Sequence, residues 1–182
     1  MLFRSIAYLR DALRLSPGEP GVAEILIGAL VRLGRDEEAI DTFSRASSYR
    51  PDDEGSLVGV AILLAARERF REAIAVLEDA HQRFPDRTAT ATTLARLLAS
   101  SPDVSLRDGK RALEIATAVN DAEPAPAHAE TVALALAELG RCGEAVDWMK
   151  RAVASAERGK NAAEASRLSG EMPKYARAVC RP

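Results

Sequence analysis

Residues 69–85 read RFREAIAVLEDAHQRFP, and this stretch holds the pattern that decides the fold. Its apolar residues recur at the spacing of one helix face, and Ala73 and Ala80 lie seven positions apart, two turns along that face. Pro85 ends the helix, because proline lacks the backbone N–H that the next turn needs. Small residues on such a face let a second helix approach closely, so the stretch predicts one half of a helix pair.

The same pattern recurs along the chain with a period of 34 residues. The residues that keep this step are Ile6, Ile40 and Ile74; Ala12, Ala46 and Ala80; Ala39 and Ala73; and Pro17, Pro51 and Pro85. The next step is 39, from Ala73 to Ala112, which is 34 plus a five-residue insertion, and the last is 33, from Ala112 to Ala145. Self-similarity at a fixed period of this length is the signature of stacked helical repeats.

The repeat predicts how the chain is divided. We expect a lone second helix over 5–15 in segment 1–17, four helix pairs over 20–53, 54–87, 88–125 and 126–157, and a capping helix over 161–172 in segment 158–182. The third pair carries the insertion, after which Ser105 is expected to begin the second helix with Asp108 completing a capping box. The unpaired first helix predicts that the chain is a fragment of a longer protein.

These residues resemble the tetratricopeptide repeat (TPR) family. The runs that carry the resemblance are Glu38-Ala39-Ile40, Phe43, Ala46 and Pro51; Glu72-Ala73-Ile74, Leu77, Ala80 and Pro85; Ala112-Leu113, Ala116, Val119 and Pro124; and Glu144-Ala145-Val146, Met149 and Ala152. The family's glycine in the first helix of each pair is replaced by Ile27, Ala61 and Ala95. The resemblance implies an all-α fold, a right-handed solenoid of antiparallel helix pairs closed by a capping helix.

The insertion extends the resemblance. Residues 97–103 read LLASSPD and residues 107–109 read RDG, which is similar to the next-to-last repeat in C-terminal TPR segments of bacterial multidomain proteins. This similarity implies a bacterial source and attachment to an enzyme or membrane domain.

Composition excludes several classes of partner. Apolar residues make up 47% of the chain but aromatic residues only 4%, which suits close packing of alanine-rich helices. The net charge of −2, without a basic stripe, argues against a nucleic-acid partner. No uncharged stretch is long enough to cross a bilayer, so we expect no direct membrane insertion.

No sequence motif indicates catalysis. His81 and His128 fall in different repeats, neither has a recognisable nucleophile motif beside it, and no phosphate loop or metal-binding motif occurs. We therefore predict a protein that is not an enzyme and that has no catalytic, cofactor or metal site.

The TPR resemblance implies a concave groove lined by the first helix of each pair, here called helix A. Carried over by position, the groove residues are Glu24, Gly28, Arg32, Val58, Ile62, Thr92, Arg96, Glu130, Leu134 and Glu138. Apolar residues at the centre and charges of both signs at the rim favour an amphipathic helix or extended peptide as partner. The predicted function is a protein–protein interaction scaffold, with a partner of unknown identity.

Two alternatives remain open at this point. The chain could be the accessory C-terminal TPR domain of a larger enzyme, such as a membrane glycosyltransferase. It could also associate with itself through the N-terminal edge, where the helix over 5–15 lacks a partner.

The two cysteines predict a disulfide. Cys142 lies in the turn before the last second helix, and two antiparallel helices then return the chain to the same level before Cys180. The tail has ample reach to close the bridge. A Cys142–Cys180 bridge would place the protein in the periplasm or outside the cell, whereas free thiols would be consistent with the cytoplasm.

Overall fold

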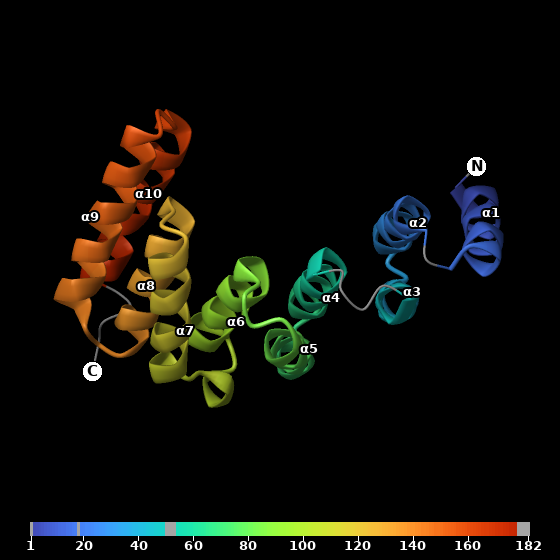
Figure 1. The fold of residues 1–182 in the computed structure, drawn as a ribbon, viewed down its shortest axis with the longest axis horizontal. Coiled ribbons are helices and arrows are strands. Elements are labelled where there is room, and N and C mark those ends of the chain that lie inside the picture. Colours follow the sequence, from blue (N-terminus) through green and yellow to red (C-terminus); the bar gives the residue numbers. More distant parts are fainter. Residues whose placement is uncertain (1, 18, 50–53, 178–182) are drawn as a thin grey trace. The chain divides into compact units, whose positions relative to one another are not determined.

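The computed structural model describes residues 2–17, 19–49 and 54–177, and within these ranges the only regular secondary structure is helical (Figure 1). In chain order the elements are α1 (Leu2–Leu15), α2 (Pro20–Arg32), α3 (Asp36–Tyr49), α4 (Glu54–Ala66), α5 (Phe70–Arg83), α6 (Thr88–Ser100), the 3₁₀ turn η1 (Val104–Leu106), α7 (Gly109–Ala122), α8 (Pro126–Glu138), α9 (Cys142–Arg158) and α10 (Ala162–Arg177). The chain divides into two compact units, Met1–Ala80 and His81–Pro182.

Sequential antiparallel packing builds each unit. In the first, α1 packs on α2, α2 on α3 and α3 on α4. In the second, α6 to α10 pack each on the next, and α6 also contacts α8. In all of these contacts but the one between α6 and α8, the packed helices are neighbours in the chain, as the repeat predicts.

Each unit has its own apolar core. In the first unit the core combines Ile6 of α1, Leu26 and Leu30 of α2, Ala39 of α3 and Leu63 of α4. Leu9, Leu13 and Phe43 pack against it while staying partly exposed. The central side chains are aliphatic, so burial of Leu and Ile area supplies most of the stabilisation here.

The second unit has a core of alanines surrounding a few larger side chains. Leu136 of α8, Met149 of α9 and Leu168 of α10 are fully buried, and Tyr175 joins them near the end of α10. The buried alanines around them are Ala95, Ala116, Ala129, Ala133, Ala137, Ala145, Ala152, Ala156 and Ala165. Small side chains let these helices approach closely, which is why so few large residues are needed to close the core.

The four repeat alanines behave as the period predicts. Ala39, Ala73, Ala112 and Ala145 are each completely buried. A larger side chain at any of these positions has no space to enter without moving the neighbouring helix. The prediction that these alanines mark the helix contacts of each repeat is confirmed.

The turn after a helix A follows one geometry in both units. In the first unit the Arg35 amide donates to the Leu30 carbonyl at 2.9 Å, and in the second the Arg141 amide donates to the Leu136 carbonyl at 2.9 Å. This is the Schellman arrangement, in which one residue adopts a left-handed conformation. Gly34 (φ 67°) and Gly140 (φ 71°) take that place, and Glu68 (φ 61°) takes it after α4. Glycine avoids the steric cost that a Cβ meets there.

An arginine–glutamate pair then begins the next helix. Arg35 pairs with Glu38, Arg69 with Glu72 and Arg141 with Glu144, each three residues apart. The carboxylates lie in the first turn, where the helix dipole favours negative charge. In the first unit the pairs also join successive turns, since Arg67 binds Asp36 and Arg69 binds Glu37.

The insertion differs from its prediction. Ser105 was expected to begin the second helix of the third pair, but α7 begins at Gly109, with Asp108 as its N-cap accepting from the Arg111 amide at 3.0 Å. Ser105 instead lies in η1, where its amide donates to Asp103 at 3.0 Å. The Asp108 amide bonds to the Leu98 carbonyl at 2.9 Å, and this backbone bond holds the helix start back against α6.

The capping helix is longer than predicted. The expected helix over 161–172 is observed as α10, which continues past Pro173 to Arg177. Proline removes one backbone hydrogen bond from a helix interior. Tyr175, placed two residues later, is buried against the second-unit core, and this burial favours continuation of the helix.

Candidate functional site

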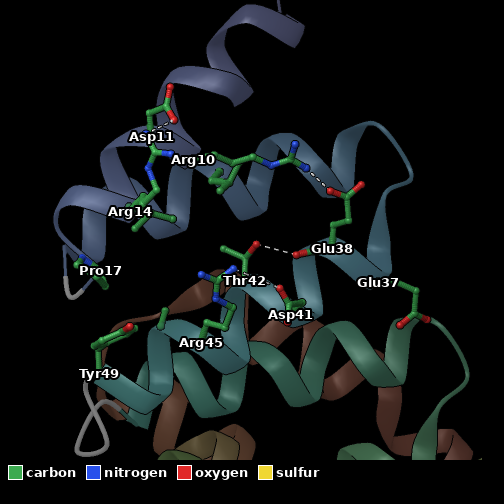
Figure 2. A pocket seen from close by; sticks show the side chains of 13 residues that line it. Arg10, Asp11, Arg14, Pro17, Glu37, Glu38, Asp41, Thr42, Arg45 and Tyr49 are labelled. Carbon is green, nitrogen blue, oxygen red and sulfur yellow. Dashed lines mark hydrogen bonds and ion pairs between the residues drawn. The ribbon is translucent and has the colours of Figure 1, made fainter.

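A cavity of about 710 Å³ opens in the first unit, lined by residues of α1, α2 and α3 (Figure 2). Leu26 of α2, Leu13 of α1 and Ala46 of α3 give it an apolar lining. Charged side chains of α1 and α3, together with Tyr49, complete its walls. A volume of this size lies in the range of pockets that hold a small ligand or a short peptide segment.

One ion pair crosses the cavity. Figure 2 shows Arg10 reaching from α1 to Glu38 of α3, and Glu38 is also bound by Arg35. The Thr42 hydroxyl donates to the Glu38 backbone carbonyl at 2.7 Å. Glu37, at the same end of α3, accepts from Arg69 at 2.7 Å. The glutamates of the cavity are therefore already engaged by arginines.

The other two arginines of the cavity are held loosely. Arg14 lies 3.3 Å from Asp11, with 77% of its side chain exposed. Arg45 lies 3.8 Å from Asp41, with 73% of its side chain exposed. Exposed pairs on one helix contribute little to stability. A guanidinium carries five N–H donors, so both arginines retain donors for a further acceptor.

The repeat explains why the cavity exists. Steps of 34, 39 and 33 relate the repeats, so the position of Thr42 corresponds to Ile115 (42 + 34 + 39) and to Trp148 (115 + 33). Ile115 and Trp148 both pack against the core of the second unit. A small polar side chain at residue 42 cannot occupy the volume that isoleucine or tryptophan would, so the space along α3 stays open.

The predicted groove residues of the first unit are solvent-accessible in part or in full. Glu24 and Arg32 of α2 are exposed, and a Cβ added at Gly28 between them would meet the Arg32 guanidinium at 3.8 Å, an ordinary van der Waals contact. On α4, Val58 is half-buried and Ile62 is 57% exposed. Ile62 is thus accessible to a partner protein on the surface of the first unit.

The predicted groove residues of the second unit form a polar network. Glu130 of α8 is buried and accepts two hydrogen bonds from Arg167 of α10, at 3.0 and 2.9 Å. Arg96 of α6 lies 3.5 Å from the same carboxylate and 3.5 Å from the Thr131 hydroxyl. The three helices are therefore connected by a guanidinium–carboxylate–guanidinium series.

The remaining predicted residues of this unit have different environments. Thr92 is half-buried one turn before Arg96, and Leu134 packs against the second-unit core. Glu138 pairs with Arg107 at 3.1 Å, and Arg107 also donates to the Ser101 carbonyl at 2.6 Å. Glu138 therefore holds the inserted segment to the end of α8.

Two pKa values respond to the network. The hydrogen bond with Glu164 and then that with Glu130 raise the pKa of Arg167, so it stays charged at any accessible pH. Burial raises the pKa of the Tyr175 phenol, and the nearby charge of Glu130 raises it further. The network therefore contains a permanent cation, Arg167, beside a neutral tyrosine.

Comparison with known families identifies the repeat. Residues 4–54 match the tetratricopeptide repeat family model. In agreement, sequential antiparallel helix pairs with buried repeat alanines continue through Tyr175. Residues 4–54 belong to the tetratricopeptide repeat family, and the helices that follow continue its fold.

Solved TPR structures share the fold over nearly the whole chain. TTC0263, a thermophilic TPR protein from Thermus thermophilus, has 17% identity and a TM-score of 0.69, covering 94% of this chain and 88% of its own. A TPR protein from Parabacteroides merdae has 17% identity and a TM-score of 0.70, covering 98% and 70%. YrrB, a TPR protein with an unusual peptide-binding site, has 14% identity and a TM-score of 0.58, covering 92% and 91%. No curated protein matches the sequence significantly.

The histidines of this TPR chain lie apart from one another. His81 is half-buried near the end of α5, and a ring nitrogen of His128 lies 2.6 Å from the Glu123 carbonyl oxygen. Among the described residues, no group of three His, Cys, Asp or Glu side chains could hold a metal ion. Over the same part of the chain, no helix has the length and apolar character to span a membrane.

The predicted disulfide involves a residue outside the described ranges. Cys142 is the first residue of α9 and is half-buried, with its Sγ 3.5 Å from the Gly140 carbonyl oxygen. Cys180 lies beyond the described residues. The Cys142–Cys180 bridge therefore stays a prediction, and so does the compartment that depends on it.

Sequence reasoning missed several residues of these sites. Arg167 was not named, and the repeat gave no signal for its contact with Glu130. Helices α6 and α8 begin 38 residues apart, so Glu130 corresponds to Thr92 and Arg96 to Leu134. The cavity beside Thr42 was also missed, and its signal was the small polar residue at a position that is apolar in later TPR repeats.

Proposed function

We propose that this TPR chain is a protein-binding scaffold whose helix A faces hold a peptide or helix of a partner. The observation that carries the proposal is the exposure of two large apolar side chains on helices A of the first unit. Ile25 of α2 is 59% exposed and Ile62 of α4 is 57% exposed. Exposed isoleucines on structured helices are good candidates for contact with a partner's apolar face.

The charged residues of the proposed groove have separate roles in each unit. In the first unit Glu24 and Arg32 are exposed beside the apolar positions, and there they would set charge preference and association rate more than affinity. In the second unit Glu130 and Glu138 are engaged by Arg167 and Arg107. Arg96 is held only loosely, so it is the charge we expect a partner to use there.

The test is Ile62→Asp in the full-length protein, with partner capture followed by mass spectrometry. We expect capture to be lost while helical content stays unchanged, because Ile62 is already exposed. Ala75→Asp is the matched control, since Ala75 is exposed on α5, which is the second helix of its pair. Equal capture by both variants would exclude the α4 face as the binding site.

We also propose that this domain catalyses no reaction itself. His81 and His128 lie in different repeats, and the His128 ring is placed against a backbone carbonyl. Turnover of any substrate that is lost on His128→Ala or His81→Ala, with the fold intact, would contradict this proposal.

A second candidate is an accessory TPR domain of a larger protein, such as a membrane glycosyltransferase. The observation that favours it is the pair of runs LLASSPD (97–103) and RDG (107–109), which are similar to the next-to-last repeat in C-terminal TPR segments of bacterial multidomain proteins. The full-length gene tests this candidate, because membrane spans and a catalytic domain encoded upstream would support an accessory TPR domain.

Self-association through α1 is a third candidate. Tyr8 and Leu15 are both exposed and lie seven residues apart, on one face of the helix. We expect Leu15→Asp to shift a dimer to monomer in sedimentation equilibrium. A monomeric parent protein at high concentration would end this candidate.

A further inference from the structure

We propose that the protein forms a two-fold symmetric dimer in which α1 packs antiparallel against α1 of a second copy. This dimer rests on the proposed self-association through α1 and gives it a partner surface, an orientation and a test of its own. Tyr8 is 73% exposed and Leu15 is 81% exposed, and both lie on the side of α1 that points away from its buried Ile6.

The exposed side of α1 corresponds, one period of 34 residues later, to the side of α3 that faces α1. The corresponding pairs are Tyr8 and Thr42, Asp11 and Arg45, Ala12 and Ala46, and Leu15 and Tyr49. All four α3 residues line the cavity that lies between α3 and α1 (Figure 2). The equivalent side of α1 is therefore the one that a second helix of another repeat would face.

Later repeats bury this side of their second helix. The residues that correspond to Tyr8 and Ala12, in steps of 34, 34, 39 and 33, are Ile115 and Val119 of α7 and Trp148 and Ala152 of α9. Those at the position of Ala12 are buried, and those at the position of Tyr8 pack against the core of the second unit. In α1 the alanine is half-buried and the tyrosine is exposed, so packing another helix there would remove apolar surface from water.

The charges beside this apolar side select a second copy of α1. Asp11 and Arg14 form a loose pair at 3.3 Å, and their side chains are 63% and 77% exposed. In an antiparallel dimer the two-fold axis brings Asp11 of each copy beside Arg14 of the other. In a parallel dimer it would bring Asp11 to Asp11 and Arg14 to Arg14, and like charges placed together oppose association. The helix is therefore self-complementary in the antiparallel orientation.

The apolar contacts and the charge contacts require nearly the same register. Residues at one level of an antiparallel helix pair have numbers with a constant sum, which is 23 for Tyr8 opposite Leu15 and 25 for Asp11 opposite Arg14. A difference of two residues is a displacement of about 3 Å along the helix axis, which the long side chains of Tyr8 and Arg14 can span. Ala12 lies near the midpoint, where a small side chain lets the two helices approach.

The dimer would leave the helix A faces to other partners. Ile25 and Ile62 belong to α2 and α4, so a dimer through α1 presents two copies of the proposed binding face, and a partner with two binding segments would gain avidity. The interface itself is small, because each copy contributes one helix of 14 residues, which is about 21 Å long. We therefore expect a weak dimer that is measured at high protein concentration.

The test exchanges charges between copies and measures the full chain by sedimentation equilibrium. Asp11→Arg and Arg14→Asp should each weaken dimerisation about tenfold or more, because each places like charges opposite one another in both halves of the interface. An equimolar mixture of the two variants should recover the dimer, because the basic chain then meets the acidic one. Both side chains are exposed, so the fold should survive, and circular dichroism checks that helical content is unchanged.

Lys150→Asp is the matched control, because Lys150 forms an exposed pair with Asp147, three residues away on α9, at 2.9 Å. We expect its dimerisation to stay within twofold of the parent protein. A monomeric parent protein, no recovery in the mixture, or an equal loss in Lys150→Asp would overturn the proposal.

One further outcome separates the orientation from self-association itself. Unchanged dimerisation of both charge variants together with a monomeric Leu15→Asp variant would overturn the antiparallel pairing and leave self-association through α1 in place. None of these results bears on capture through Ile62, which is measured separately.

Discussion

Helices α3 and α9 hold the same place in their repeats, but the surroundings of one residue differ. Residue 42 of α3 is a threonine whose hydroxyl bonds to its own helix at Glu38, and a cavity of about 710 Å³ lies beside it. The equivalent residue of α9 is Trp148, which packs against the core of the second unit. The repeat therefore keeps its helix contacts through the small alanines. At the position of Thr42 and Trp148 the side chain varies between repeats, and the space beside it is either open or filled.

The units also differ in how they use charge. The pairs of the first unit, such as Arg67–Asp36 and Arg69–Glu37, are partly exposed at the turns. In the second unit Glu130 is buried between α6 and α10 and bound by Arg167. Exposed ion pairs contribute little to stability, whereas removing the partner of a buried carboxylate destabilises the fold.

The largest expected loss of stability comes from truncating a core leucine, and it should differ between the two units. Leu136→Ala should cost about 3–5 kcal/mol, because Leu136 is enclosed on all sides and its removal leaves a new cavity. Leu26→Ala should cost less, about 2–3 kcal/mol, because Leu26 already borders an open space. Urea denaturation of both variants measures the difference. Equal losses would mean that the cavity does not relieve the packing of Leu26.

The next effect concerns the buried carboxylate. Arg167→Met should cost about 2–3 kcal/mol, because it leaves the buried Glu130 with Arg96, at 3.5 Å, and without its two hydrogen bonds from Arg167. Arg151→Met, at an exposed position of α9, should change stability by less than about 0.5 kcal/mol. Thermal unfolding monitored by circular dichroism compares the two. Similar melting midpoints for both variants would show that the Glu130 network is not needed for stability.

A smaller effect of opposite sign in the two units is expected at the turns. Gly140→Ala should destabilise the second unit by about 1 kcal/mol, because the residue has φ 71° and a Cβ is disfavoured there. Glu68→Gly should stabilise the first unit by up to about 1 kcal/mol, because Glu68 already bears that strain at φ 61°. Denaturant midpoints test both, and a destabilised Glu68→Gly variant would show that the side chain makes a contact worth more than the strain.

The smallest effect is a pH dependence at the turn pairs. The hydrogen bond from Arg67 lowers the pKa of Asp36, and that from Arg141 lowers the pKa of Glu144. A carboxyl whose folded pKa is below its unfolded value stabilises the fold above the unfolded pKa and loses this contribution as pH falls through the folded one. Stability should therefore decline slightly below about pH 4. Arg67→Gln should reduce the decline, and an unchanged pH profile would contradict the assignment.

Parts of the fold could be predicted because they depend on local chemistry. The period of 34 places Ala39, Ala73, Ala112 and Ala145 on helix contacts, and prolines and glycines indicate where helices end. The start of α7 could not be predicted correctly, because Ser105 and Asp108 both suit an N-cap. The Asp108 amide donates a hydrogen bond to the Leu98 carbonyl of α6, and α7 begins after this contact between separate elements.

The helical class, the repeat and the alanines at the helix contacts could all be predicted before any coordinates were known. Each of these depends on residue type at a fixed spacing, and such patterns are visible without coordinates. Only the tertiary structure decided that Glu130 is bound by Arg167, that Tyr175 is buried beyond Pro173, and that the cavity stays open beside Thr42. Burial and charge pairing depend on which side chains of different helices meet. The spacing of residues along one helix does not give the distances between side chains on different helices.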